Sequence, residues 1–228
     1  MANSLSLVEM HPGVWRGSQA QMKQSRLLPT GFTHFDSALS GGFPASGVIR
    51  IVCLPGCGEL SFLKSVFNSL QAETLAMFIN APGMLTAPWL NRTGLNPSDC
   101  KLVTAPDDLS GWATEEAIKS DACSIVCCWT KSILPGQARR LQVAAAQHEC
   151  MVVLFEHPVN VQHPLPIALD LLFMPATEGF EVNINKQLKG WPVRGVKERF
   201  KYTPDNSAIA SAMSRFNRLP EQDGARHG

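Results

Sequence analysis

Residues 28–64 read LPTGFTHFDSALSGGFPASGVIRIVCLPGCGELSFLK, and they contain the clearest indication of the fold class. Its apolar run from Val48 to Cys53 has the length and composition of a buried strand. A turn rich in glycine and proline follows, and then a stretch with Leu60, Leu63 and Phe67 on one helical face. A strand, a glycine-rich turn and a helix in this order predict the first βα unit of a parallel sheet.

The same alternation continues along the chain. Further apolar runs lie at 75–80, 101–104, 124–129 and 151–156, with helical stretches between them, one carrying Trp112 and Ile118 and another at about 136–147. Beyond residue 166, strand-like stretches at 168–174, 180–185 and 193–202 follow one another without a helix. Strands in direct succession favour antiparallel pairing. We therefore expect an α/β fold, a mainly parallel sheet flanked by helices with an antiparallel C-terminal extension.

Length and composition indicate one core. The chain has 228 residues, 45% of them hydrophobic, and a formal net charge of +1, so no overall field attracts nucleic acid. We expect an N-terminal arm at 1–27, a core domain at 28–202, and a polar tail at 203–228 that is disordered or folds on a partner. No apolar run approaches about 18 residues, and the N-terminus lacks a signal-peptide pattern. These features predict a cytoplasmic protein that does not enter a membrane.

The seven cysteines do not form the pattern of a disulfide framework. Their number is odd and they lie mostly in apolar segments, so we expect reduced thiols. Cys123 and Cys127 lie in a predicted buried strand, and no second pair stands at zinc-ligand spacing. The sequence therefore predicts no metal site.

The residues before the first strand resemble the entry to the RecA-type ATPase core. In that core a Thr-Gly pair, a Leu-Asp-like pair, a Gly-Gly turn and a Pro-x-x-Gly lead into the first strand and then into the phosphate loop. The matching residues here are Thr30, Gly31, Phe35, Asp36, Leu39, Gly41, Gly42, Pro44 and Gly47. The resemblance implies a RecA-like fold.

The phosphate loop of this chain lacks the groups that hydrolyse ATP. A working loop needs backbone N–H groups around phosphate, a Lys on the β and γ oxygens, and a Ser or Thr on Mg²⁺. When Gly58 is placed on the last glycine of the motif, Glu59 replaces the Lys and Leu60 replaces the Ser or Thr. Cys53 replaces the first glycine. The degenerate loop comprises Gly56, Cys57, Gly58, Glu59 and Leu60.

The second half of the ATP machinery is missing as well. Strand 124–129 ends in Trp129, where an Asp would be needed to organise Mg²⁺. We expect a strand-to-helix turn, no enzyme activity and no cofactor, while weak nucleotide binding without turnover stays open. Glu156, His157 and the acidic Asp36 lie near strand ends, but no nucleophile with a base accompanies them, so they indicate no catalytic site.

Several segments together resemble a known family. They are HPGVWRGSQ at 11–19, GCGELSFL at 56–63, SDACSIVCCW at 120–129 and ARRLQVAAAQHECMVVLFEHP at 138–158, and they resemble ImuA, the RecA-like accessory factors of damage-induced mutagenesis. This implies a role in SOS-induced error-prone translesion synthesis, with an ImuB-like Y-family polymerase homologue, an error-prone DnaE-type polymerase and RecA as partners. Residues 75–158 also resemble SulA, the SOS-induced division inhibitor, which implies the alternative partner FtsZ.

Two pairs of residues are candidates for partner binding. Trp15 and Arg16 lie in the expected arm, and both residue types are enriched among interface anchors, although Trp15 packed back on the core is an equal alternative. Arg139 and Arg140 are expected to point outward from their helix. They would pair with acidic groups of a partner or form a solvated face.

The C-terminal extension is the candidate for contact with single-stranded DNA. Its basic residues are Lys186, Lys189, Arg194, Lys197, Arg199 and Lys201, with the aromatic Trp191, Phe200 and Tyr202 among them. Cations neutralise phosphates, and aromatic rings stack on bases. The same Lys and Arg residues would equally suit an edge hairpin that blocks strand addition.

Overall fold

The computed structural model describes residues 26–70, 74–161 and 164–200. The expected tail and all but the last two residues of the expected arm lie outside this part of the chain. The strands are β1 (Leu27–Leu28), β2 (Phe43–Pro44), β3 (Gly47–Val52), β4 (Leu75–Ile79), β5 (Cys100–Val103), β6 (Cys123–Thr130), β7 (Met151–Glu156), β8 (Leu169–Ala176), β9 (Gly179–Lys186) and β10 (Val193–Glu198). The helices are α2 (Thr33–Ala38), α3 (Glu59–Phe62), α4 (Lys64–Asn68), α5 (Ala87–Thr93), α6 (Ser110–Lys119) and α7 (Pro135–Gln147), with 3-10 turns at Pro97–Asp99, Asp107–Leu109 and Pro158–Asn160.

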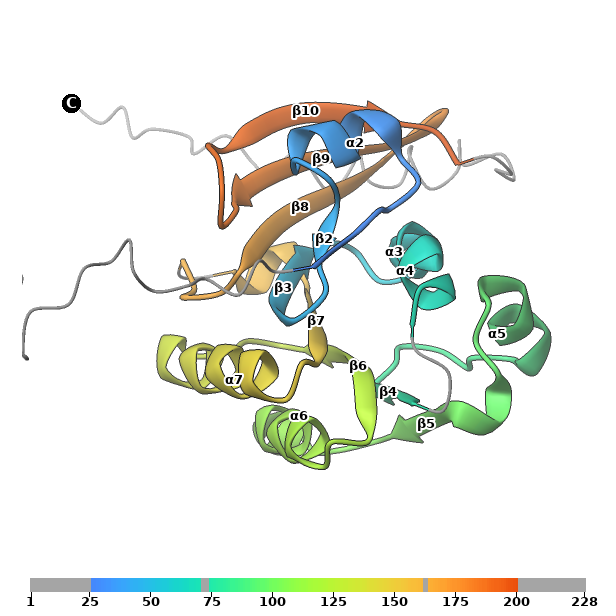
Figure 1. Cartoon of the computed structure of the whole chain (residues 1–228), viewed down its shortest axis with the longest axis vertical. Helices are drawn as coiled ribbons and strands as arrows, with labels where there is room; N and C mark the ends of the chain where they lie inside the picture. Colours follow the sequence, from blue (N-terminus) through green and yellow to red (C-terminus); the bar gives the residue numbers. More distant parts are fainter. Residues whose placement is uncertain (1–25, 71–73, 162–163, 201–228) are drawn as a thin grey trace, which may run out of the picture.

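Strands β3 to β10 form one eight-stranded sheet in the order β10-β9-β8-β3-β7-β6-β4-β5 (Figure 1). The six strands from β8 to β5 in this order run parallel, and β9 is antiparallel to both β8 and β10. The prediction of an α/β fold with a mainly parallel sheet and antiparallel C-terminal strands is confirmed. One detail is wrong, because β8 is parallel to β3. The connection at 157–168 is long enough to return the chain to the amino end of the sheet.

Helices cover both faces of the sheet. Helices α2 to α5 pack on the face that carries Ile49 and Ile51, and α6 and α7 pack on the opposite face with Val48 (Figure 1). Successive strand side chains point to opposite faces, so β3, buried on both, has only buried residues. This explains why β3 is apolar apart from Arg50.

Phe62 of α3 lies at the centre of an aromatic cluster. Its ring centroid is 5.0 Å from Phe35 of α2, 5.4 Å from Phe43 of β2, and 5.2 Å from both Phe173 of β8 and Phe180 of β9. Most of these ring pairs are edge-on or tilted, which the aromatic quadrupole favours. The cluster joins the helix after the phosphate loop to the C-terminal strands.

Two helices differ from the sequence-based expectation. The first predicted helix is divided at Leu63 into the short helices α3 and α4. In α6 the buried residues are Ser110, Thr114, Ala117 and Ile118, and Trp112 is 61% exposed. The buried stripe of α6 thus follows small residues at helical spacing, and a large apolar side chain lies outside it.

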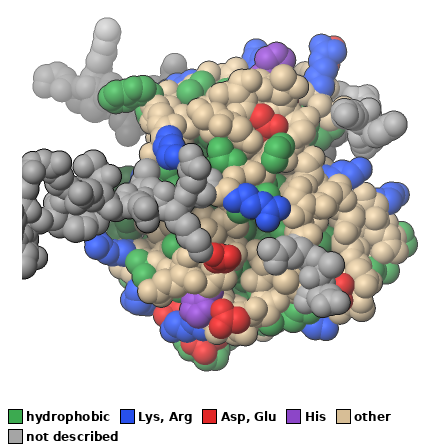
Figure 2. Space-filling view, viewed as in Figure 1, with side chains coloured by type: hydrophobic (Ala, Val, Ile, Leu, Met, Phe, Trp, Pro, Cys, Tyr) green, Lys and Arg blue, Asp and Glu red, His purple; other side chains and the backbone are tan. Residues whose placement is uncertain are grey.

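Charged side chains are dispersed over the face that Figure 2 shows. On the face in Figure 2, Lys and Arg residues lie apart from one another and are interspersed with acidic residues. This agrees with the near-neutral composition. Within the described ranges, no helix is long and apolar enough to cross a membrane.

Candidate functional site

The degenerate loop keeps the backbone shape of a phosphate cradle. Gly56 and Gly58 have φ angles of 78° and 104°, in the left-handed region, and α3 begins directly after Gly58. Successive turns of this kind direct backbone N–H groups into a concavity that binds anions. The glycines are needed here because residues with a Cβ adopt these angles at a steric cost.

The side chain of Glu59 occupies this concavity. Its Oε1 accepts a hydrogen bond from the Gly56 N–H at 2.9 Å, and its Oε2 accepts one from the Gly58 N–H at 3.1 Å. The residue is only 3% exposed. Hydrogen bonds to an ionised carboxylate are stronger than neutral ones, and an acid at a helix start is also stabilised by the helix dipole. An internal carboxylate therefore takes the two backbone donors that a bound phosphate would use.

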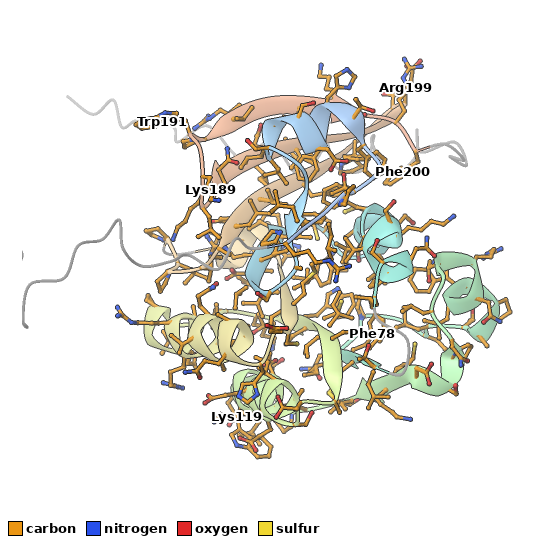
Figure 3. All side chains as sticks on the ribbon, in the orientation of Figure 1. Phe78, Lys119, Lys189, Trp191, Arg199 and Phe200 are labelled. Carbon is orange, nitrogen blue, oxygen red and sulfur yellow. The ribbon has the colours of Figure 1, made fainter. Side chains whose placement is uncertain are left out.

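The C-terminal extension covers the loop from the side. A Cβ built on Gly58 would lie 3.2 Å from Cε2 of the Phe200 ring. That ring also lies 4.8 Å from Phe180 and 5.8 Å from Phe32, between centroids (Figure 3). The sequence had assigned Phe200 to a surface for DNA bases, but the structure packs it against the core. Phe200, two residues beyond the end of β10, therefore packs against the loop at Gly58.

Trp129 lies where a Mg²⁺-binding acid would stand, and its indole is part of the core. The indole stacks on Phe155 of the neighbouring strand β7, with centroids 4.6 Å apart and planes at 20°. It is 8% exposed and belongs to the same apolar cluster as Cys53 and Cys57 of the loop. The carboxyl ends of β6 and β7 therefore present stacked aromatic rings on this face.

A crevice of about 360 Å³ opens beside the loop. Its lining comprises Gly56, Gly58, Glu59, Leu60, Ser61, Met84, Leu85, Thr86, Trp89 and Arg92. Among these described residues, Arg92 is the single cation, and it belongs to α5 and not to the loop. Met84 is 87% exposed. The crevice therefore combines a carboxylate, one arginine and an apolar wall.

The cysteine side chains lie in the core. All seven are free and buried. A hydrogen bond with Cys57 and desolvation raise the pKa of Cys53 well above its usual range. Burial likewise raises the pKa of Cys128 to about 11 and that of Cys150 to about 12. Because the thiolate is the nucleophile, these thiols are unreactive at neutral pH.

Asp36 and His157, which lie near strand ends, have structural partners. Asp36 accepts hydrogen bonds from the Thr30 N–H at 2.9 Å and the Thr30 hydroxyl at 2.6 Å, which closes the turn before α2. His157 accepts a hydrogen bond from the backbone of Val159 at 3.3 Å and caps a 3-10 turn. These contacts give both residues a structural role.

Sequence reasoning missed a buried ionic triad. Arg50 in the centre of β3 binds Asp170 of β8, with Nε 3.0 Å from Oδ1 and Nη2 2.6 Å from Oδ2. Its Nη1 lies 3.2 Å from Oε2 of Glu156, at the end of β7. All three are at most 6% exposed, and burial raises the pKa of Glu156 while Arg50 opposes that shift. The signal was present as single charges inside the apolar runs VIRIV and ALDLL.

The predicted partner-binding residues are placed only in part. Trp15 and Arg16 lie outside the described residues. Arg139 is exposed on α7, and Arg140 has its Nε 3.5 Å from Oε2 of Glu115 on α6. Such an exposed pair contributes little stability, so both arginines are consistent with a solvated face.

The basic residues of the extension do not form one patch. Lys186 donates to the Leu165 carbonyl at 2.9 Å, Lys197 lies 4.0 Å from Glu181, and Arg199 pairs with Glu178. Lys189 lies in the β9–β10 loop and Arg199 beyond the other end of β10 (Figure 3). Lys201 lies outside the described residues. DNA contact stays a prediction, and the structure divides its candidate residues between two ends of a strand.

Comparisons with known proteins find similarity to solved structures but none to a family model or a curated sequence. The crystal structure of SulA from Pseudomonas aeruginosa is similar, with a TM-score of 0.41 and 20% identity, covering 48% of this chain and 97% of the SulA chain. The resemblance of the sequence to ImuA stays a prediction.

Proposed function

We propose that this protein acts by binding other proteins and does not hydrolyse ATP. The observation that carries the proposal is the Glu59 carboxylate, which accepts hydrogen bonds from Gly56 and Gly58 inside the phosphate loop. A triphosphate that displaced this carboxylate would break the hydrogen bonds of Glu59 to the loop. A triphosphate that bound beside it would be repelled by the like charge. Trp129 adds to this, because an indole stacked on Phe155 cannot ligate Mg²⁺.

Exchanging the loop residues tests this proposal. We expect the native protein to bind MgATP more weakly than about 1 mM, and Glu59→Lys combined with Leu60→Ser to tighten binding by at least about tenfold, because the pair restores a cation and a hydroxyl. Isothermal titration calorimetry measures both affinities. Neither protein should release phosphate, since Trp129 remains.

The variant Glu59→Gln is the matched control. It keeps the side-chain length but removes the charge, so it should lower the free energy of unfolding by about 1–2 kcal/mol without creating strong ATP binding. Turnover by the native protein that disappears in a Gly58→Ala variant would contradict the non-catalytic proposal.

The partners follow from the two family resemblances of the sequence, which both lead to the SOS response. We propose an accessory role in error-prone translesion synthesis as the main function, with an ImuB-like polymerase homologue, RecA and a DnaE-type polymerase as partners. The segment HPGVWRGSQ at 11–19 supports this choice, because it lies in front of the region that resembles SulA. The alternative function is inhibition of cell division by binding FtsZ.

Direct binding measurements distinguish the two functions. The tagged full chain is immobilised and offered, one at a time, purified ImuB-like protein, RecA, DnaE-type polymerase and FtsZ. Binding of the ImuB-like protein or RecA, lost when Trp15 and Arg16 are both replaced by Ala, is the expected result. Binding of FtsZ alone, together with filamentation of cells that express the protein, would replace the main function by the alternative.

A further inference from the structure

The loop that joins β9 to β10, residues 187–192, presents two apolar side chains to solvent. Trp191 is 87% exposed and Leu188 is 57% exposed. The Gln187 side-chain amide donates a hydrogen bond to the Trp191 carbonyl at 2.7 Å. Gly190 is required beneath this bridge, because its φ is 141° and a Cβ there would lie 2.8 Å from Nε2 of Gln187. The hydrogen bond thus fixes the loop backbone at Trp191, while the indole itself lies in solvent.

A small cavity lies beside this loop. Its volume is about 150 Å³. The residues that line it are Leu27, Leu39, Ser40, Gly42, Pro44, Ala168, Leu169, Gln187, Leu188 and Lys189. Five of these ten are leucine or proline and one is charged, so the cavity suits an apolar group. A cavity of this size accommodates about one benzene ring.

The charges around the loop are positive. Lys189 lines the cavity and Arg194 lies at the start of β10, and neither has a carboxylate partner among the residues that the structure describes. At the other end of β10, Lys197 and Arg199 are each paired with a glutamate. The loop end of the hairpin is therefore the end that retains uncompensated cations. It attracts acidic groups.

We propose that this surface, comprising Leu188, Lys189, Trp191, Arg194 and the adjoining cavity, docks an acidic segment of a partner protein. An aromatic or aliphatic side chain of the segment fills the cavity, and Trp191 packs over it. Lys189 and Arg194 face the flanking carboxylates. The proposal rests on the proposed function, because it names the surface through which a protein-binding role is carried out.

Single-stranded nucleic acid fits the same surface less well. A nucleic-acid groove needs a row of cations that follows the phosphates. Here Glu181 pairs with Lys197 and Glu178 pairs with Arg199. These glutamates interrupt the row of cations after Arg194. The lining of the cavity is mostly apolar, so it suits an apolar side chain of a peptide better than a charged phosphate.

The test uses the full chain and three labelled probes. The first is a short peptide of Asp and Glu with a central Phe, the second has Ala in place of that Phe, and the third is oligo-deoxythymidine. Fluorescence anisotropy at low salt gives each affinity. The Phe peptide should bind at least about tenfold more tightly than the Ala peptide, because only the Phe fills the cavity.

Variants identify the surface. Trp191→Ala should lower the affinity for the Phe peptide by about thirtyfold. The double variant Lys189→Glu with Arg194→Glu should lower it by at least about tenfold. The matched control, Lys197→Glu with Arg199→Glu, should leave the affinity unchanged. Circular dichroism establishes that each variant is folded.

Three results would overturn the proposal. The first is equal affinity for the Phe and Ala peptides, or no saturable binding of either. The second is tighter binding of oligo-deoxythymidine that Trp191→Ala abolishes. The third is peptide binding only after Trp15→Ala, which would assign the cavity to the chain's own residues 1–25. If the peptides fail while the ImuB-like protein, RecA or FtsZ still binds, the proposed function stands and uses another surface. If the peptides bind and no partner does, the docking surface stands alone.

Discussion

Replacing Arg50 with Met is expected to lower the free energy of unfolding by about 3–5 kcal/mol. The substitution keeps much of the side-chain volume but leaves Glu156 and Asp170 buried without their cation. Desolvated carboxylates without a partner are among the most costly groups in a protein interior. Chemical denaturation at neutral pH measures the loss. A change below about 1 kcal/mol would show that the triad does not hold β3 between its neighbours.

The pH dependence of this loss gives a second readout. Burial already raises the pKa of Glu156 above its ordinary value, and Arg50 is what opposes the shift. Without Arg50 the folded-state pKa rises further, so the folded variant binds a proton that the unfolded chain has released. Stability is then present at low pH and is lost as pH rises through the raised pKa. The deficit of Arg50→Met should therefore be largest at neutral pH and shrink toward pH 4.5, the ordinary value for Glu.

A triple variant serves as the control for the triad. Arg50→Met combined with Glu156→Gln and Asp170→Asn removes all three charges together. It should recover most of the stability lost in the single variant, because no unpaired charge remains. The recovery should be independent of pH between neutral and mildly acidic conditions. No recovery would mean that Arg50 matters for its packing and not for its charge.

Replacing Phe62 with Ala is expected to cost about 3–5 kcal/mol. The ring is fully buried and contacts aromatic rings from α2, β2, β8 and β9, so its loss leaves a cavity that several elements would have to close together. Because α3 also begins with Glu59, the same change should loosen the loop. Hydrogen exchange at the Gly56 and Gly58 amides should accelerate more than global unfolding requires.

Two variants bracket this result. Phe62→Leu retains most of the apolar volume and should cost less than half as much. Trp112→Ala removes a larger ring that is 61% exposed and should cost less than about 1 kcal/mol. If Trp112→Ala proves as costly as Phe62→Ala, exposure is not what separates the two rings.

The class of fold and the absence of the ATP-hydrolysing groups could be predicted from the residues alone. The positions of the strands followed from short apolar runs such as 75–80 and 151–156, because a strand buried on both faces needs apolar residues throughout. The replacements Glu59 and Leu60 followed from residue chemistry at known spacing. Both inferences depend only on neighbouring residues, which a sequence displays directly.

The directions of the side chains at the site depend on the folded structure and could not be predicted from the residues. That the Glu59 carboxylate turns back into the loop depends on φ angles at Gly56 and Gly58, which the glycines permit but do not dictate. That Arg50 meets Asp170 and Glu156 depends on β3 lying between β8 and β7, strands about a hundred residues away in the chain. Pairing between distant strands is set by the packing of the whole sheet, so the loop's occupant and the triad became visible only in the folded chain.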